Sequence, residues 1–318
     1  ARTRLAETYG PPTRLDLPGV GLVSAGAIGV VWGLVQATDV GWGSPEVIGA
    51  LGLGALLLIG FLAWEARASE PMLPLRLFGN PGFAAASATT FLMIAALSAA
   101  AFLVTGYFQF GRGHSPLETG LRMLPWTGTP MIIAPLAGAL SDRIGRRSVM
   151  TTGMLLQGAG LAWFAALATI GAPYAGLVPA LVVAGVGVSM AIPTTATAMV
   201  SAVTAEDMGK AAGVNSTLQR FGSVFGIALA SAVFAGSGHL GSAAGFAAGS
   251  QPALAVAAGF SLIGAVTGMA VGLGLAAIVT SVFSDEGLSF ALPAGSLVAF
   301  AVVAVLAGVL AAVLPARR

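Results

Sequence analysis

Long apolar runs, separated by short polar connectors, constrain the fold of this chain more than any other feature. Most of these runs reach about 20 residues, the length that a helix needs to cross a hydrocarbon core of about 30 Å. They cover residues 17–36, 47–64, 83–110, 120–140, 148–170, 175–200, 213–234, 253–283 and 292–314. The sequence therefore predicts an all-α integral membrane protein that crosses a cell membrane several times.

Composition supports this assignment and excludes other classes of protein. Hydrophobic residues make up 57% of the chain and charged residues 8%, with a mean hydropathy of +0.92; soluble domains carry about 25% charged residues. The net charge of +2 is small and the arginines lie in connectors, so no nucleic-acid partner is expected. There is no cysteine, and the histidines His114 and His239 stand alone in Gly/Ser-rich stretches, so we expect no metal site and no cofactor.

The distribution of Lys and Arg predicts the side on which each connector lies, because short cytoplasmic loops are enriched in both. Basic connectors alternate with nearly uncharged ones through the run at 213–234. Arg112 and Arg122, in an expected outer turn, are exceptions. Simple alternation also puts the terminal Arg317 and Arg318 outside, against the charge rule, so the orientation of the last helix stays open.

One connector, residues 138–149, combines an acid with three arginines between two apolar runs. Asp142 is expected to accept hydrogen bonds from the free amides that begin the next helix. Gly145 permits a sharp reversal of the chain. A generic basic cytoplasmic loop is the alternative interpretation. The residues that define this loop are Gly138, Asp142, Arg143, Gly145, Arg146 and Arg147.

The pattern G-x-L-x-D-R-x-G-R-R in this loop resembles the signature of the major facilitator superfamily. Further stretches at 15–19, 70–78, 114–120 and 209–215 extend the resemblance, over residues 1 to about 265, to fourteen-helix drug:proton antiporters of the EmrB/QacA type. The resemblance implies a C-terminal six-helix bundle preceded by a helix pair, and it makes the residues of the charged loop candidate cytoplasmic gating residues. The ninth apolar run adds one extra C-terminal helix. The expected divisions are a cytoplasmic connector (1–16), a helix pair (17–66), an amphipathic cytoplasmic linker (67–82), the transporter bundle (83–270) and a tail (271–318).

The tail, about residues 261–318, is similar instead to the C-terminus of FtsX/MacB-type ABC permeases. A junction between the two kinds of sequence is expected near residues 260–265. Two alternative functions follow from this tail and from the missing start: an ABC-permease-related subunit or scaffold, and an inactive transporter fragment.

No Asp or Glu lies inside an apolar run, so the sequence offers no evident carboxylate for proton coupling. Apart from Arg122 at the very start of the run 120–140, Arg220 is the one charge within a predicted crossing. With Asn215 and Gln219 it lines an inner vestibule, pairs with a loop acid, or extends toward the cytoplasm. Further cavity candidates have an interfacial or packing role as their alternative. These candidates are Tyr107, Gln109, Trp126 and Gln157.

Catalytic patterns are absent from the sequence, so the chain is not expected to be an enzyme. The function that fits best is transmembrane transport, as the C-terminal part of a proton-coupled exporter of drugs or other small lipophilic molecules. Its expected partners are the lipid bilayer of the inner or plasma membrane, a small-molecule substrate and protons. A missing N-terminal half or a second copy would complete the pathway.

Overall fold

A computed structural model describes residues 16–69, 71–169, 171–238 and 242–282. Eight of its helical segments are long and apolar enough to cross a membrane, in agreement with the first eight apolar runs. The ninth run, at 292–314, lies outside the described residues. In chain order the elements are α1 (Leu17–Val40), α2 (Pro45–Glu65), the 3₁₀ turn η1 (Leu75–Gly79), α3 (Pro81–Gly106), the π-helical turn η2 (Tyr107–Gly111), α4 (Pro116–Thr127), α5 (Thr129–Ile144), α6 (Arg146–Leu167), α7 (Tyr174–Ser201), the 3₁₀ turn η3 (Ala205–Asp207), α8 (Met208–Ser237) and α9 (Ala243–Val282).

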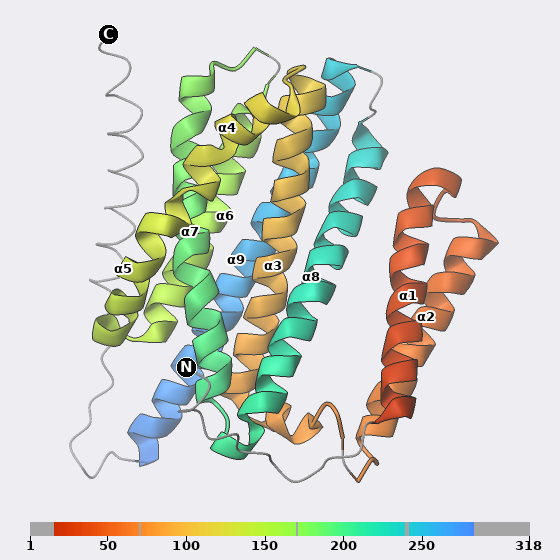
Figure 1. The fold of residues 1–318 in the computed structure, drawn as a ribbon, viewed down its shortest axis with the longest axis vertical. Helices are drawn as coiled ribbons and strands as arrows, with labels where there is room; N and C mark the ends of the chain where they lie inside the picture. The colour runs from red at the N-terminus through yellow and green to blue at the C-terminus, as the bar shows by residue number, and fades with distance from the viewer. Residues whose placement is uncertain (1–15, 70, 170, 239–241, 283–318) are drawn as a thin grey trace, which may run out of the picture.

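Helices α3 to α9 form one bundle, and α1 with α2 form a hairpin beside α8 (Figure 1). The hairpin exposes large apolar side chains, among them Ile28 and Leu56, on its outer surface. Eight membrane-length helices that expose such apolar residues form an all-α membrane fold. The hairpin and the bundle match the expected helix pair followed by a six-helix bundle.

Small residues bring the bundle helices close together. Ala95, Ala96, Ala99 and Ala100 of α3 are fully buried. A Cβ atom on Gly226 of α8 would collide with the backbone of Ala95, so no larger residue fits this crossing. Small side chains at such contacts are the usual means by which membrane helices approach one another.

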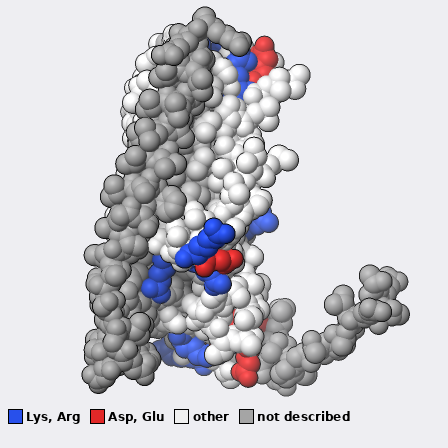
Figure 2. All heavy atoms as spheres, turned by 90° about the vertical axis from the view of Figure 1, so that its left-hand side faces the viewer, with Lys and Arg blue, Asp and Glu red and all other residues white. Residues whose placement is uncertain are grey.

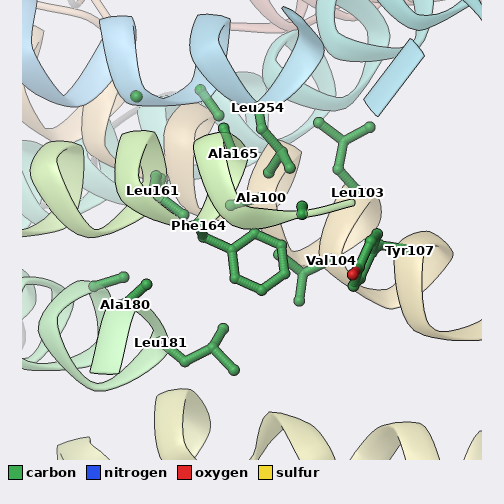
Figure 3. Packing of buried hydrophobic residues seen from close by; sticks show 14 of the residues in the cluster. Ala100, Leu103, Val104, Tyr107, Leu161, Phe164, Ala165, Ala180, Leu181 and Leu254 are labelled. Carbon is green, nitrogen blue, oxygen red and sulfur yellow. The ribbon is translucent and has the colours of Figure 1, made fainter. Parts of the chain in front are cut away.

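The core of the bundle lies between α3, α6, α7 and α9. Figure 3 shows the ring of Phe164, from α6, close to Val104 and Tyr107 near the end of α3. The ring centroids of Tyr107 and Phe164 are 5.6 Å apart, with an edge-on arrangement that aromatic pairs prefer. Leu181 of α7 and Leu254 of α9 complete the cluster.

The fourth crossing is broken into α4 and α5, and prolines lie on both sides of the break. The break falls at Gly128, whose backbone N–H still donates to the carbonyl of Leu124 at 2.8 Å. Pro130 lies in the first turn of α5, where a proline costs little because the first N–H groups of a helix have no intrahelical partner. The crossing as a whole begins at Pro116, earlier than expected from the apolar run alone.

The prediction of a loop directly before the eighth crossing is wrong. Helix α9 begins at Ala243 and includes Pro252, whereas a loop was expected through Ser250. Phe246 explains the difference, because its ring is buried against Gly106 and lies 4.9 Å from that of Phe234. Tertiary packing thus fixes a Gly/Ala/Ser-rich segment as helix. From there α9 runs without interruption through the expected junction and across residue 270 to Val282.

Candidate functional site

The turn between α5 and α6 is the connector with the charged signature. Gly145 has a φ of +88°, a conformation that favours glycine, and its N–H donates to the carbonyl of Ser141 at 3.1 Å. The predicted reversal at Gly145 is therefore confirmed. Around it, Asp142 and Arg143 are exposed in the last turn of α5, and Arg146 is exposed at the start of α6.

The predicted capping of α6 by Asp142 is wrong. The N-cap position is Gly145, and no side chain accepts a hydrogen bond from the first amides of α6. The reason is that α5 continues to Ile144, which makes Asp142 a residue of the helix before the turn. Side chains in a helix lean toward its N-terminus, so that of Asp142 leans away from the start of α6.

Two arginines of the signature face a cleft at this end of the bundle. Arg146 donates through Nη1 to the Oγ of Ser201, which joins the start of α6 to the end of α7. Arg146 and Arg147 line a cleft of about 350 Å³ together with Asn80 of the α3 N-cap, Ser201 and Gly268 of α9. Figure 2 views the molecule from the side that carries α5 and shows Lys and Arg gathered in its lower part, while much of the visible surface is uncharged.

Polar contacts hold this end of the bundle together. The side chain of Asn80 accepts hydrogen bonds from the first amides of α3, and its Nδ2 donates to the carbonyl of Ala202, at the end of α7, at 2.9 Å. Arg76 of η1 forms an ion pair with Asp207 of η3 at 2.8 Å. The Asp207 side chain is 5% exposed and that of Arg76 is 69% exposed. Sequence reasoning missed this pair because the two residues are far apart in the chain.

The linker before α3 is part of this assembly. Leu77 is buried, and the ring of Phe78 lies edge-on to that of Phe83 with centroids 5.1 Å apart. Leu77, Phe78 and Phe83 pack with Met199 of α7 and Ala211 of α8. The apolar side of the expected amphipathic segment therefore covers the base of the bundle.

Two of the cavity candidates of η2 and α4, Tyr107 and Trp126, lie in the bundle core. Tyr107 is 1% exposed, and its hydroxyl donates to the carbonyl of Thr169 at 2.7 Å while accepting from Arg112 at 3.3 Å. Trp126 belongs to the same buried cluster, so the structure brings these two candidates together. Gln109, in the π-helical turn, is half-buried.

Gln157 lies elsewhere, at the crossing of α6 with α3 and α7. It is fully buried, and its Nε2 donates to the carbonyl of Met93 at 3.5 Å while its Oε1 has no partner. The backbone of Gly187 on α7 touches that of Gln157 so closely that a Cβ on Gly187 would collide with it. Gly185 is packed as closely, against Trp126 and Thr129, so both glycines allow α7 to approach its neighbours.

Arg220 lies on the wall of a larger cleft, of about 660 Å³, between α8 and the hairpin. Phe61 of α2, Met72 of the linker and Lys210 of α8 also line it. Within the described part of the chain, Arg220 makes no ion pair with an acid. The structure therefore shows a cation at the edge of a mostly apolar cleft.

The other two polar residues of α8 are more enclosed. Asn215 and Gln219 are half-buried, and the Oδ1 of Asn215 is buried without a hydrogen-bond partner. Neither residue lines the cleft that contains Arg220, so the expected group of three is not brought together around one cavity. The described residues hold no group of His, Asp and Glu that suits a metal ion.

Comparison with known proteins identifies the family. Residues 17–227 and 86–270 match the Major Facilitator Superfamily. The chain is 33% identical over 220 residues to the "Tetracenomycin C resistance and export protein" of Streptomyces glaucescens, covering 69% of this chain and 40% of that protein. It is 32% identical over 231 residues to "Multidrug resistance protein Stp" of Mycobacterium tuberculosis, covering 70% and 41%. It is 31% identical over 233 residues to "Cephamycin export protein CmcT" of Amycolatopsis lactamdurans, covering 73% and 48%.

The chain thus spans less than half of the length of these relatives. Among solved structures, that of the nucleoside transporter NupG superposes with a TM-score of 0.53 at 16% identity, over 77% of this chain and 65% of that one, and supports the fold alone. Because the family match extends from the first helix of the hairpin into α9, the chain is a multi-pass membrane protein that belongs to the Major Facilitator Superfamily.

Proposed function

We propose that this chain is the C-terminal part of a proton-coupled exporter of drugs or other small lipophilic molecules, of the EmrB/QacA fourteen-helix type. The observation that carries the proposal is its similarity to several resistance and export proteins at 31–33% identity. The order of elements supports it, because a helix pair precedes a six-helix bundle as that type requires. We assign no enzymatic reaction to the chain and place it in the inner or plasma membrane.

The charges of the α5–α6 turn support a gating role better than a local structural one. Asp142 lies in the last turn of α5, where the helix dipole is negative, and Arg146 and Arg147 lie in the first turn of α6, where it is positive. Each such placement costs about 0.3–1 kcal/mol at a helix end. Since Asp142 and Arg146 do not stabilise their own helices, the proposal gives these exposed charges a further contact, with a facing bundle or with lipid headgroups.

In this proposal the turn acts as a cytoplasmic latch. Transporters of this fold move two bundles against each other around a site near the middle of the membrane. A latch of exposed charges favours the state in which those charges meet a partner, so its strength differs between the two states. The contact of Arg146 with Ser201 then holds the base of the latch against α7.

The substrate surface in this proposal lies on the bundle helices that face the other half. Arg220 with the cleft beside α8, and the core residues Tyr107 and Trp126, are the candidates on this chain. A complete pathway requires the N-terminal half of a transporter or a second copy of this chain. The relatives are more than twice as long as the stretch they share with it.

The test is a transport assay in cells that lack their own exporters. The chain is expressed alone and together with the N-terminal half of the tetracenomycin C resistance and export protein, and accumulation of a fluorescent lipophilic dye is measured. Co-expression is expected to lower accumulation, and an uncoupler is expected to abolish the effect. Unchanged accumulation, with both proteins present in the membrane, contradicts export; a reduction that survives the uncoupler contradicts proton coupling.

A further inference from the structure

Two carboxyl groups meet at the cytoplasmic end of the hairpin, outside the site described above. Glu65, the last residue of α2, is 3% exposed, and its Oε2 accepts a hydrogen bond from the backbone N–H of Leu73 at 2.9 Å. Asp16 lies directly before α1, and its Oδ1 accepts from the N–H of Gly19 at 3.0 Å and from Nε1 of Trp64 at 2.9 Å. Each carboxyl group thus has one oxygen that accepts hydrogen bonds from the protein.

The other two oxygens, Oδ2 of Asp16 and Oε1 of Glu65, are buried and have no hydrogen-bond partner. Both lie within 3.0 Å of the position that a Cβ atom on Gly19 would occupy, so they face each other across that glycine. An unpartnered buried carboxylate oxygen is costly, and two that face each other repel as well. A single proton between the two oxygens removes both penalties.

No described cation offers an alternative to that proton. Among the residues that the structure describes, Arg67 is the basic residue nearest in sequence to the pair, and its Nη1 donates to the carbonyl of Ala63 at 2.9 Å. On α8, Lys210 and Arg220 face the neighbouring cleft, and neither forms an ion pair with the two acids. The carboxyl group of Asp16 is the charged side chain that acts on Glu65, and the two side chains are within hydrogen-bond reach of each other.

We propose that Asp16 and Glu65 form a one-proton carboxyl pair, in which Oε1 of Glu65 carries the proton and donates it to Oδ2 of Asp16. The pair is a proton-binding site that joins three segments: the start of α1, the end of α2 and, through Leu73, the linker that leads to α3. Loss of the proton places two negative charges against each other at this junction.

The hydrogen bonds that Asp16 accepts favour its ionised form, so Glu65 is the residue that carries the proton. The backbone N–H of Gly19 lowers the pKa of Asp16, with further lowering by Trp64 and Glu65 against the opposing effect of burial. Asp16 is therefore the carboxylate of the pair, and Glu65 is the acid. The inference does not depend on transport, and its test requires no substrate.

The experiment is infrared spectroscopy of the purified full chain at neutral pH in H₂O and D₂O. The wild type is expected to show the C=O stretch of a protonated carboxyl group, shifted in D₂O. Glu65→Gln is expected to remove this band, while Glu46→Gln, an exposed glutamate in the first turn of the same helix, leaves it unchanged. Absence of the band from the wild type, or its persistence in the Glu65 variant, overturns the proposal.

Two further variants test the contact between the groups and serve if Glu65→Gln fails to fold. Asp16→Asn is expected to shift the band, because Glu65 then donates to an amide and not to a carboxylate. Gly19→Ala is expected to shift it by placing a methyl group between the oxygens, whereas Gly21→Ala, with nothing within 4 Å of its Cβ position, leaves it in place. An unshifted band in both Asp16→Asn and Gly19→Ala shows that the proton is not shared, and refutes the pair.

Discussion

The crossing of α6 and α7 gives the sharpest prediction about stability. A Cβ atom on Gly187 would collide with backbone atoms of Gln157 and Gly153, and backbone cannot move aside as a flexible side chain can. Gly176 lies on the same helix, and the nearest atom to its Cβ position is Cγ of Pro173 at 3.8 Å, an ordinary van der Waals contact. Alanine at the two positions therefore differs in packing and not in secondary structure.

The two effects of alanine have opposite signs. Replacing a glycine inside a helix by alanine stabilises by about 0.5–1 kcal/mol through backbone entropy. Overpacking a close contact destabilises by about 1–3 kcal/mol. We expect Gly176→Ala to be neutral or stabilising and Gly187→Ala to be destabilising, with a difference of about 1–3 kcal/mol between them.

Thermal unfolding in detergent, followed by tryptophan fluorescence and by the fraction of monodisperse protein after heating, measures this difference. The reasoning is refuted if Gly187→Ala unfolds at the same temperature as Gly176→Ala or at a higher one. That result would mean that α6 and α7 separate at no cost. Close packing of α6 against α7 would then not hold Arg146 and Ser201, which lie on these two helices, next to each other.

Further predictions concern the α5–α6 end of the bundle, α8 and Asp16. Asn80→Ala is expected to cost about 1–2 kcal/mol in thermal unfolding, because both the cap of α3 and the donor to Ala202 are lost, whereas Asn80→Asp keeps the cap and should cost less. Arg146→Ala is expected to abolish most export by the complete transporter while stability falls by about 1 kcal/mol or less; a loss of export that only follows the loss of folded protein contradicts the latch. Arg220→Gln is expected to reduce export of cationic or lipophilic dyes, and unchanged efflux removes Arg220 from the pathway. The pKa of Asp16 is lower in the folded chain than its usual 3.8, so its contribution to stability is present above that pH and fades as the pH falls through the folded value; unfolding curves of wild type and Asp16→Asn should converge in acid.

Much of the fold follows from the sequence alone, because a membrane imposes its thickness on each helix. The apolar runs located eight crossings to within a few residues at most ends. The start of α9 was missed because Gly, Ala and Ser carry no periodic apolar signal. Only the burial of Phe246 against Gly106, from a distant part of the chain, reveals that this segment is helical.

The site was harder to predict, since it depends on which side chains face one another. The charged turn and the reversal at Gly145 were evident from spacing, but the cap by Asp142 was not, because its geometry depends on where α5 ends. The pair of Arg76 with Asp207 joins residues that only folding brings together. The sequence does contain one indication of this pair. Asp207 lies directly before α8, where a negative charge interacts favourably with the helix dipole.

The carboxyl pair shows why a search limited to the middle of each apolar run is incomplete. Such a search counts Glu65 as a boundary residue exposed to water, yet the linker folds back over it and leaves it 3% exposed. Burial at a helix end also favours the neutral form of an acid when no cation is near. The proposed pair of Asp16 and Glu65 would therefore place one proton site at the junction between the hairpin and its linker, outside the middle of any crossing. If infrared spectroscopy finds that site while Glu65→Gln leaves proton-coupled export intact, the pair holds the hairpin to its linker and takes no part in coupling.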